Sequence, residues 1–349
     1  MNEFTPNPEK PKKLLAACPA YKSSPVIKTN AIANIDLLIK DETQRMGLGS
    51  FKALGGVYAA AMLLAEKWQE STGKKLKPEM FTSEEFKQFS SSVTFICASA
   101  GNHGLAVASG AKLFGAKARI HLSAEVPKAF EQRLLSKSAT VIWSGKVYDD
   151  SVAAAIQDAE QGNGFLLADG SWEGYTYPPS LVMEGYTVIA EELREAFTLS
   201  KEWPTHVFLQ AGVGGLAAAM AYIIRENWEQ QPEIIIVEPD LAPCLRDSHK
   251  KGAVTTVSGD ISIMGRLDCK VPSLLAFNAL EKVQVRYTAI SDQEAIQASH
   301  LLQKNNIDTT PSGAAGLAGL LKHQRLETEK KSSPNTTFFP LIIVTEEKI

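Results

Sequence analysis

Short apolar runs alternate with stretches of helical periodicity along most of this chain, and that alternation constrains the fold most. Between residues 93 and 168 it predicts strands and helices in turn, at 93–98, 105–114, 117–122, 128–138, 140–143, 149–161 and 164–168. A second series follows at 205–210, 216–227 and 233–237. Such alternation with short links is typical of parallel sheets with right-handed crossovers. We therefore expect an α/β fold of two lobes, each a mostly parallel sheet flanked by helices, with a cleft between them.

The remaining segments carry weaker patterns. Residues 1–30 are rich in Pro, Lys and Asn, which predicts an extended arm. A strand is expected at 35–40 and a helix at 50–71, where apolar residues recur at helical spacing. The polar stretches 73–92 and 329–337 are interpreted as a surface connection and a loop.

Composition narrows the class of protein. A chain of 349 residues is long enough for one large or two ordinary domains with full cores. The net charge of −3 predicts no nucleic-acid or anionic-membrane partner. No apolar run reaches the ~18 residues of a membrane helix, and the first residues lack the apolar segment of a secretory signal. We expect a soluble cytoplasmic enzyme.

Metal binding is not expected from the pattern of cysteine and histidine. The four cysteines are widely spaced and form no C-x-x-C pair, and the six histidines show no metal-ligand spacing. The cysteines are interpreted as reduced thiols, mostly buried. We therefore predict no metal centre.

A glycine-rich loop follows the strand expected at 205–210. In Gly212-Val213-Gly214-Gly215 the backbone amides can converge on an anion at a helix N-terminus, because no Cβ atoms obstruct them. The loop matches neither G-x-G-x-x-G nor a Walker A motif, which disfavours a nucleotide. Taken alone, a tight strand-to-helix turn explains it equally well.

A second loop, Ser99-Ala100-Gly101-Asn102-His103-Gly104, also follows a strand and opens a helix. Its amides and the Ser99 hydroxyl can hold a carboxylate, and the Asn102 side chain can donate to a phenolic oxygen. A helix cap formed by Ser99 or Asn102 is the alternative. Because a cap does not require the surrounding Gly-Asn-His-Gly, we favour a substrate loop.

Lys52 stands in Ser50-Phe51-Lys52-Ala53-Leu54-Gly55-Gly56. Apolar neighbours and the glycine pair predict partial desolvation, which lowers the pKa of a lysine and makes it a better nucleophile toward a carbonyl. A reactive lysine, a carboxylate loop and a phosphate cradle together indicate pyridoxal phosphate chemistry on an amino acid.

Further motifs extend along nearly the whole chain, at 40–58, 99–104, 169–175, 185–186, 210–216, 237–239, 263–264, 311–317 and 344–346. Through them the chain resembles the fold-type-II pyridoxal-phosphate enzymes, the group of tryptophan synthase β, threonine dehydratase and serine racemase. Within this group it is most similar to the diaminopropionate ammonia-lyases, through residues 41–54 and 169–175. The resemblance implies a homodimer. We expect residues 1–87 and 176–349 to form a large cofactor-binding domain and 88–175 a small domain.

The resemblance also implies roles for individual residues. Lys52 corresponds to the Schiff-base lysine, Asn102 to the partner of the phenolic oxygen and Thr345 to the partner of the pyridine nitrogen. The phosphate loop corresponds to Gly212, Val213, Gly214, Gly215 and Leu216. Substrate binding is assigned to Ser99, Ala100, Gly101, Asn102 and His103, although His103 as a lone loop histidine also fits a structural role. Asp169 corresponds to an active-site acid, with a turn cap beside Gly170-Ser171 as an equal alternative.

The predicted activity is β-elimination from 2,3-diaminopropionate, a carbon–nitrogen lyase reaction that yields pyruvate and ammonia. The freed lysine would act as the base at Cα, and Asp169 would serve the β-amine. Relatives that act on D-substrates carry Ser or Asp at the position of Ala100, so the L-enantiomer is expected. A serine or threonine dehydratase is the first alternative.

Three departures from the family pattern qualify this prediction. Thr310-Pro311 stands where relatives often carry Glu, and Glu347 replaces a Gly expected close to the cofactor ring. The chain also stops at Ile349, earlier than the lyases. Glu347 and the short C-terminus motivate a second alternative, a protein that binds the cofactor but has little catalytic turnover.

Overall fold

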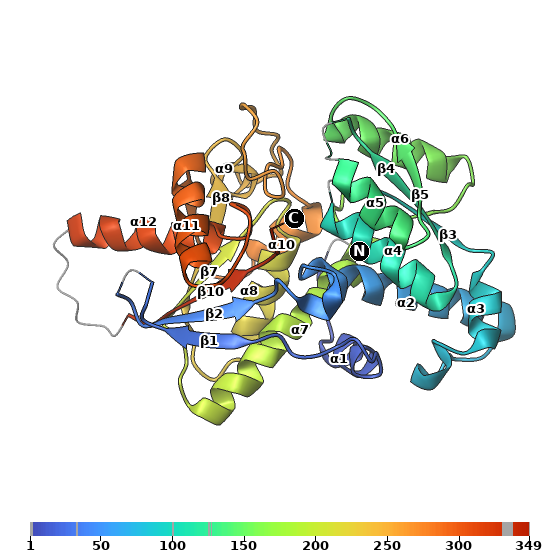
Figure 1. The fold of residues 1–349 in the computed structure, drawn as a ribbon, viewed down its shortest axis with the longest axis horizontal. Helices are drawn as coiled ribbons and strands as arrows, with labels where there is room; N and C mark the ends of the chain where they lie inside the picture. The colour runs from blue at the N-terminus through green and yellow to red at the C-terminus, as the bar shows by residue number, and fades with distance from the viewer. Residues whose placement is uncertain are drawn as a thin grey trace.

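The computed structural model describes residues 3–32, 34–99, 101–124, 126, 128–329 and 338–348, and its strands form two sheets (Figure 1). The six-stranded sheet has the order β1-β2-β10-β7-β8-β9, with β1 (Val26–Thr29), β2 (Leu37–Asp41), β7 (His206–Gln210), β8 (Glu233–Pro239), β9 (Arg286–Ile290) and β10 (Pro340–Val344). The four-stranded sheet has the order β5-β4-β3-β6, with β3 (Thr94–Ala98), β4 (Lys117–Leu122), β5 (Thr140–Trp143) and β6 (Phe165–Leu166). Apart from the β1–β2 pair, the strand pairs of the described residues are parallel. The predicted fold class is confirmed.

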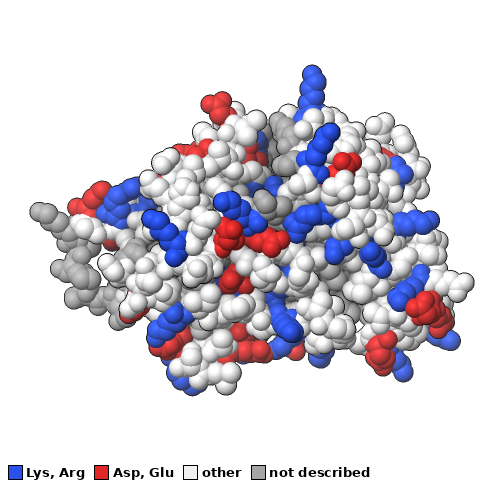
Figure 2. Space-filling model, in the orientation of Figure 1, with Lys and Arg blue, Asp and Glu red and all other residues white. Residues whose placement is uncertain are grey.

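Helices cover both sheets, and none of those in the described residues is long and apolar enough to cross a membrane. They are α1 (Glu9–Ala16), α2 (Lys52–Thr72), α3 (Glu84–Ser90), α4 (Asn102–Phe114), α5 (Lys128–Ser136), α6 (Tyr148–Glu160), α7 (Tyr177–Ser200), α8 (Gly215–Asn227), α9 (Cys244–Lys251), α10 (Leu274–Leu280), α11 (Asp292–Lys304) and α12 (Ala315–Glu329), with short 3₁₀ turns at Arg45–Gly47 and Pro78–Met80. Basic and acidic side chains are interspersed over the face shown in Figure 2.

The central strands β7, β8 and β10 of the larger sheet are buried on both faces, which explains why they are largely apolar runs. Side chains alternate along a strand, so Leu341 and Ile343 of β10 join the core formed with α7, α8 and α10. Ile342 and Val344 join the opposite core, formed with α11 and α12. The proposed domain boundaries place all the strands of the smaller sheet within residues 88–175.

The prediction of an extended arm over residues 1–30 is wrong. The segment contains helix α1, which packs on α7, and strand β1, which pairs with β2. Pro11 and Leu15 are the buried residues of α1. Spaced four apart, they form a stripe of one turn that the surrounding Lys and Pro residues obscure in the sequence.

The polar connection expected at 73–92 also contains regular structure. Helix α3 begins after Ser83, whose hydroxyl accepts a hydrogen bond from the Phe86 amide at 3.2 Å. Phe86 is buried against Trp68 of α2, with ring centroids 5.8 Å apart. Isolated apolar residues in a polar stretch gave no periodic signal, and the helix depends on this tertiary contact.

Helix α2 begins at Lys52 and packs between α4 and α7 through very small residues. A Cβ atom on Gly185 of α7 would lie 2.7 Å from the Gly55 Cα atom of α2. On the other side, a Cβ atom on Gly56 would lie 2.6 Å from the Ala106 Cβ atom of α4. The helices therefore approach backbone to backbone, and this packing sets the position of Lys52.

A buried ionic network holds the segment that leads into α2. The Arg45 guanidinium binds Glu42 and Glu192 at 2.7 Å, and the Lys40 ammonium lies 2.6 Å from Glu192. Burial opposes the charge of Glu192, but hydrogen bonds and charge from Arg45 outweigh it and lower its pKa to about 2. The network connects β2 and the turn at Arg45–Gly47 to α7. It therefore holds the segment that precedes Lys52 against α7.

We predict that Gly185→Ala lowers the free energy of unfolding by about 1–3 kcal/mol, because the methyl group would overlap the α2 backbone. Denaturant titration measures the effect. Gly265→Ala is the control, since nothing lies within 4 Å of a Cβ atom there. Equal midpoints for the two variants would contradict the tight crossing.

Candidate active site

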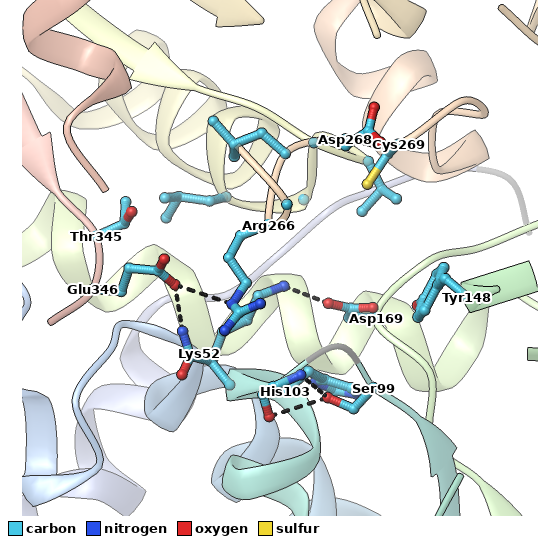
Figure 3. A pocket seen from close by; sticks show the side chains of 18 of the residues that line it. Lys52, Ser99, His103, Tyr148, Asp169, Arg266, Asp268, Cys269, Thr345 and Glu346 are labelled. Carbon is cyan, nitrogen blue, oxygen red and sulfur yellow. Dashed lines mark hydrogen bonds and ion pairs between the residues drawn. The ribbon is translucent and has the colours of Figure 1, made fainter. Parts of the chain in front are cut away.

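A cavity of about 500 Å³ lies where β3, β7 and β10 end and where α2, α4 and α8 begin (Figure 3). Ligands of parallel α/β sheets bind at such carboxyl edges. The cavity brings together almost all the predicted site residues: Lys52, Ser99, Gly101, Asn102, His103, Asp169, Gly212, Val213, Gly214, Gly215, Leu216 and Thr345. Ala100 lies outside the described residues.

Backbone contacts join the Lys52 segment to the end of β10. The Phe51 amide donates to the Thr345 carbonyl oxygen at 3.2 Å. In return, the Glu347 amide donates to the Gly49 carbonyl oxygen at 2.9 Å. These residues are far apart in sequence, and the pairing places Lys52 and Thr345 on the same cavity.

Lys52 and Asp169 form an ion pair inside the cavity, shown as a dashed line in Figure 3. Burial favours the neutral form of each group, but the opposite charges outweigh it. The pKa of Lys52 is raised above its usual range, and the pKa of Asp169 is held well below its own. The expected lowering of the Lys52 pKa is therefore wrong for this state, because the sequence did not show that a carboxylate would lie against the ammonium.

The glycine loop forms a cradle at the N-terminus of α8. Gly214 has φ of +101°, a conformation that favours glycine. A Cβ atom on Gly212 would lie 3.0 Å from both the Arg266 carbonyl oxygen and the Cys269 Sγ atom. The Ser273 amide donates to the Val213 carbonyl oxygen at 2.9 Å and holds the loop in place. Amides at a helix N-terminus with this access fit a phosphate group.

The loop that follows β3 is closed by its own hydroxyl group. Ser99 Oγ accepts hydrogen bonds from the Gly101 amide at 3.0 Å and the Gly104 amide at 2.8 Å. Ser99 thus makes the cap-like contacts that the alternative interpretation described, and two amides of the loop are already used. Substrate binding by the loop stays a prediction.

His103 connects α4 to the segment that carries Asp169. Its Nε2 atom donates to the Leu167 carbonyl oxygen at 2.8 Å. Burial lowers the pKa of His103, so the ring is neutral and Nε2 carries the hydrogen. This contact favours the structural role considered for His103.

Asn102 is held by Glu346, a residue that the sequence analysis did not assign to the site. The Asn102 Nδ2 atom donates to the Glu346 carboxylate, and Asn102 Oδ1 has no partner among the described residues. Thr310 Oγ1 donates to the same carboxylate at 2.5 Å. Burial raises the pKa of Glu346. One amide hydrogen of Asn102 remains for a phenolic oxygen.

Thr345 presents a buried hydroxyl group at the end of β10, next to Glu346 (Figure 3). Gln210 Nε2 lies 2.9 Å from the Ile343 carbonyl oxygen and 3.3 Å from Thr345 Oγ1. Because Thr345 accepts this contact, its own hydrogen is free to be donated into the cavity. A hydroxyl donor fits the pyridine nitrogen expected there.

Several cavity residues carried no recognisable sequence signal: Tyr148, Arg266, Asp268, Cys269 and Glu346. Only Glu346 had an indirect one, since it directly follows Thr345 at the end of an apolar strand. The others come from loops or from the first turn of α6, where no periodicity relates them to the cavity.

Glu347 does not lie where the sequence analysis placed it. It is absent from the described cavity lining, and its carboxylate lies 3.2 Å from Arg133 of α5. A Cβ atom on Gly49 would overlap its side chain. Adjacent residues of an extended segment point in opposite directions, so Glu346 enters the cavity and Glu347 leaves it.

Comparison with known proteins finds a matching family, related sequences and similar structures. Residues 18–336 match the family described as pyridoxal-phosphate dependent enzyme. The diaminopropionate ammonia-lyase of Escherichia coli strain K12 is 34% identical over 342 residues, covering 93% of this chain and 84% of the relative. A probable D-serine dehydratase of Oenococcus oeni is 27% identical, covering 87% and 73%. The crystal structure of the Escherichia coli lyase in complex with D-serine superposes with a TM-score of 0.86 at 30% identity, covering 99% and 92%.

We predict that the wild-type protein absorbs visible light after reconstitution with pyridoxal phosphate and that Lys52→Ala abolishes this absorbance. The amine that would bond to the aldehyde is removed in the variant. Borohydride reduction followed by peptide mass analysis should place the cofactor on Lys52. Lys67→Ala, on the same helix but outside the cavity lining, is the control. A wild-type protein that takes up no cofactor would refute the site.

Proposed function

The chain belongs to the pyridoxal-phosphate dependent enzyme family and is an ammonia-lyase of that family, and we propose that its substrate is 2,3-diaminopropionate. In the reaction, one molecule of substrate and one of water give pyruvate and two molecules of ammonia. The observation that carries the proposal is the contact between Lys52 and an ionised Asp169 within the cavity.

When bound, the cofactor withdraws electrons from the substrate Cα atom and so stabilises the negative charge left by proton removal. We propose that the glycine loop at residues 212–216 holds its phosphate, Asn102 its phenolic oxygen and Thr345 its ring nitrogen. The hydroxyl of Thr345 carries no counter-charge, which favours rapid elimination over a long-lived carbanion.

The residues of this chain then handle protons. Lys52, the residue whose amine would bond to the cofactor, would also be the base that removes the proton from the substrate Cα atom. The β-amine leaves only as ammonia, so it must be protonated as it departs. Asp169 is the carboxylate that can hold the β-ammonium group, or take a proton from it and return that proton to the amine as it departs.

The dehydratase alternative differs in the leaving group. With the cofactor bound, its phosphate would be a proton source for a β-hydroxyl, which would then have no need of Asp169. Relatives that include probable D-serine dehydratases keep this second candidate open. The low-turnover alternative loses one of its premises, because Glu347 faces Arg133.

We expect β-elimination from 2,3-diaminopropionate to exceed that from serine or threonine. Asp169→Asn should lower kcat/KM for 2,3-diaminopropionate by about 100-fold, within the range for loss of general acid–base catalysis, and that for serine by far less. Coupled assays of pyruvate and ammonia on a small amino-acid panel measure both. Asp268→Asn is the matched control, since the Asp268 carboxylate already binds Lys270 at 2.6 Å. In this variant the ratio of kcat/KM for 2,3-diaminopropionate to kcat/KM for serine should not change.

Two outcomes would count against this assignment. Equal losses on both substrates in Asp169→Asn would leave Asp169 with a structural role. Faster turnover of threonine by the wild type would favour the dehydratase.

A second expectation concerns stereochemistry and rests on residue 100 in the sequence. Lys52 addresses one face of Cα, so the other enantiomer needs a base on the opposite face, within about 2.6–3.2 Å of the atom that carries the proton. The Ala100 methyl group cannot accept a proton. We therefore propose a strong preference for the L-enantiomer and negligible racemisation.

Pyruvate release from D- and L-2,3-diaminopropionate, measured separately, tests this preference. Ala100→Asp should gain activity on the D-enantiomer while retaining activity on the L-enantiomer. Comparable wild-type rates on both enantiomers would show that another group, such as Asp169, serves the second face.

A further inference from the structure

A second cavity, of about 330 Å³, lies outside the candidate active site, and the proposed reaction assigns it no task. It is formed where the later turns of α2 face strands β3 and β6 and the start of α7. Its volume is at the lower end of the range for small-molecule sites, roughly 300–1,000 Å³, so it suits a ligand of modest size.

Much of the lining of this second cavity is apolar or aromatic. Val93 and Phe95 of β3 line it, and both are buried. Phe165 and Tyr177 also line it, and their side chains are 44% and 50% exposed. Aromatic side chains that stay exposed around a concave surface are available to a ligand. A ligand that fits here therefore has an apolar or aromatic body.

Charged side chains of α2 also line the second cavity. Glu66, Lys67 and Glu70 share one side of the helix because they are adjacent or one turn apart. The Lys67 ammonium lies 3.8 Å from the centroid of the Phe165 ring and forms no ion pair with a carboxylate among the described residues. Glu66 accepts a hydrogen bond from the Tyr177 hydroxyl, whereas Glu70 is exposed. Lys67 and Glu70 thus offer a cation and an anion, which complements a zwitterion.

Tyr175 connects the second cavity to the segment that carries Asp169. It lines the cavity, and its hydroxyl donates to the Leu166 carbonyl oxygen at 2.9 Å and accepts from the Ala168 amide at 3.1 Å. Ala168 directly precedes Asp169, which pairs with Lys52 in the active site. A ligand that packs on Tyr175 therefore stabilises the conformation of the segment that holds Asp169.

We propose that the second cavity is an effector site for an α-amino acid with an apolar or aromatic side chain. The ligand carboxylate binds Lys67, its ammonium group lies beside Glu70, and its side chain packs on β3 and Tyr175. Because a ligand shifts a protein toward the conformation that it binds more tightly, occupancy raises the affinity of the active site for its substrate. Binding at this site does not depend on the proposed substrate, and the coupling is read with whichever amino acid the enzyme turns over.

Binding is measured on protein whose cofactor has been fixed to Lys52 by borohydride, so that the ligand amine cannot bond to the aldehyde. Calorimetry compares L-phenylalanine with phenethylamine, which lacks the carboxylate, and with 3-phenylpropionate, which lacks the amine. The wild type should bind L-phenylalanine at least about 5-fold more tightly than either analogue, since each analogue lacks one charged contact.

Two variants separate the charged contacts. Lys67→Met should reduce the preference for L-phenylalanine over phenethylamine by about 5- to 10-fold, because the partner of the carboxylate is lost. Glu70→Gln should reduce the preference over 3-phenylpropionate in the same way. Lys74→Met is the matched control, an exposed lysine just after α2 that is absent from the described lining of the second cavity. In this control both preferences should equal those of the wild type.

The coupling is measured on the untreated enzyme. Saturating L-phenylalanine should lower the KM of the substrate by about 5-fold or more, within the range for coupling between two sites. Lys67→Met should lose this effect, and it also reports any direct competition of L-phenylalanine at the active site. Tyr175→Phe keeps the ring and removes the hydroxyl, so it should bind L-phenylalanine as the wild type does and lose the effect on KM.

Three outcomes would overturn parts of the proposal. The site is refuted if the reduced wild type does not bind L-phenylalanine at millimolar concentration, or if Lys67→Met and Glu70→Gln leave both preferences unchanged. The coupling is refuted if L-phenylalanine has the same effect on KM in the wild type and in Lys67→Met. An effect on KM that persists in Tyr175→Phe would refute the role assigned to the Tyr175 hydroxyl.

Discussion

The close crossing of α2 with α4 and α7 is the constraint on which the rest of this structure depends. Gly55 and Gly56 of α2 meet Gly185 and Ala106 at distances that leave no room for larger side chains. Because α2 begins at Lys52 and α4 begins at Asn102, the crossing sets the relative positions of the two residues. The packing of small residues in the core therefore also determines the geometry of the site.

The charge states of the cavity residues depend on burial and on their nearest charged partners. Burial favours neutral forms, yet Lys52 and Asp169 stay charged because each is the partner of the other. Burial raises the pKa of Glu346, and its counter-charge is too weak to reverse the shift, since Arg266 Nε is 3.6 Å away. The pKa values of the two carboxylates in this cavity are therefore shifted in opposite directions, that of Asp169 downward beside the Lys52 ammonium and that of Glu346 upward by burial.

Sequence patterns predicted the bounds of helices and strands most reliably where buried side chains recur along the element. Strands β4 and β7 lie within one residue of the ranges expected at 117–122 and 205–210, and buried apolar residues recur along both. They were least reliable where a few apolar residues act alone, as with Leu15 of α1 and Phe86 of α3. Such residues bury their side chains against other elements, which no local pattern records.

The sequence by itself determined the α/β class, the family and the cofactor, because these follow from periodicity and from motifs in which neighbouring residues act together. Lys52, Asn102 and the glycine loop could be identified from their immediate neighbours. Only the tertiary structure decided which side chains meet. It placed Asp169 against Lys52, turned Glu346 inward and Glu347 outward, and brought Arg266 to the cavity. These contacts join residues far apart in the chain, and their charge states depend on burial and partners that exist only after folding.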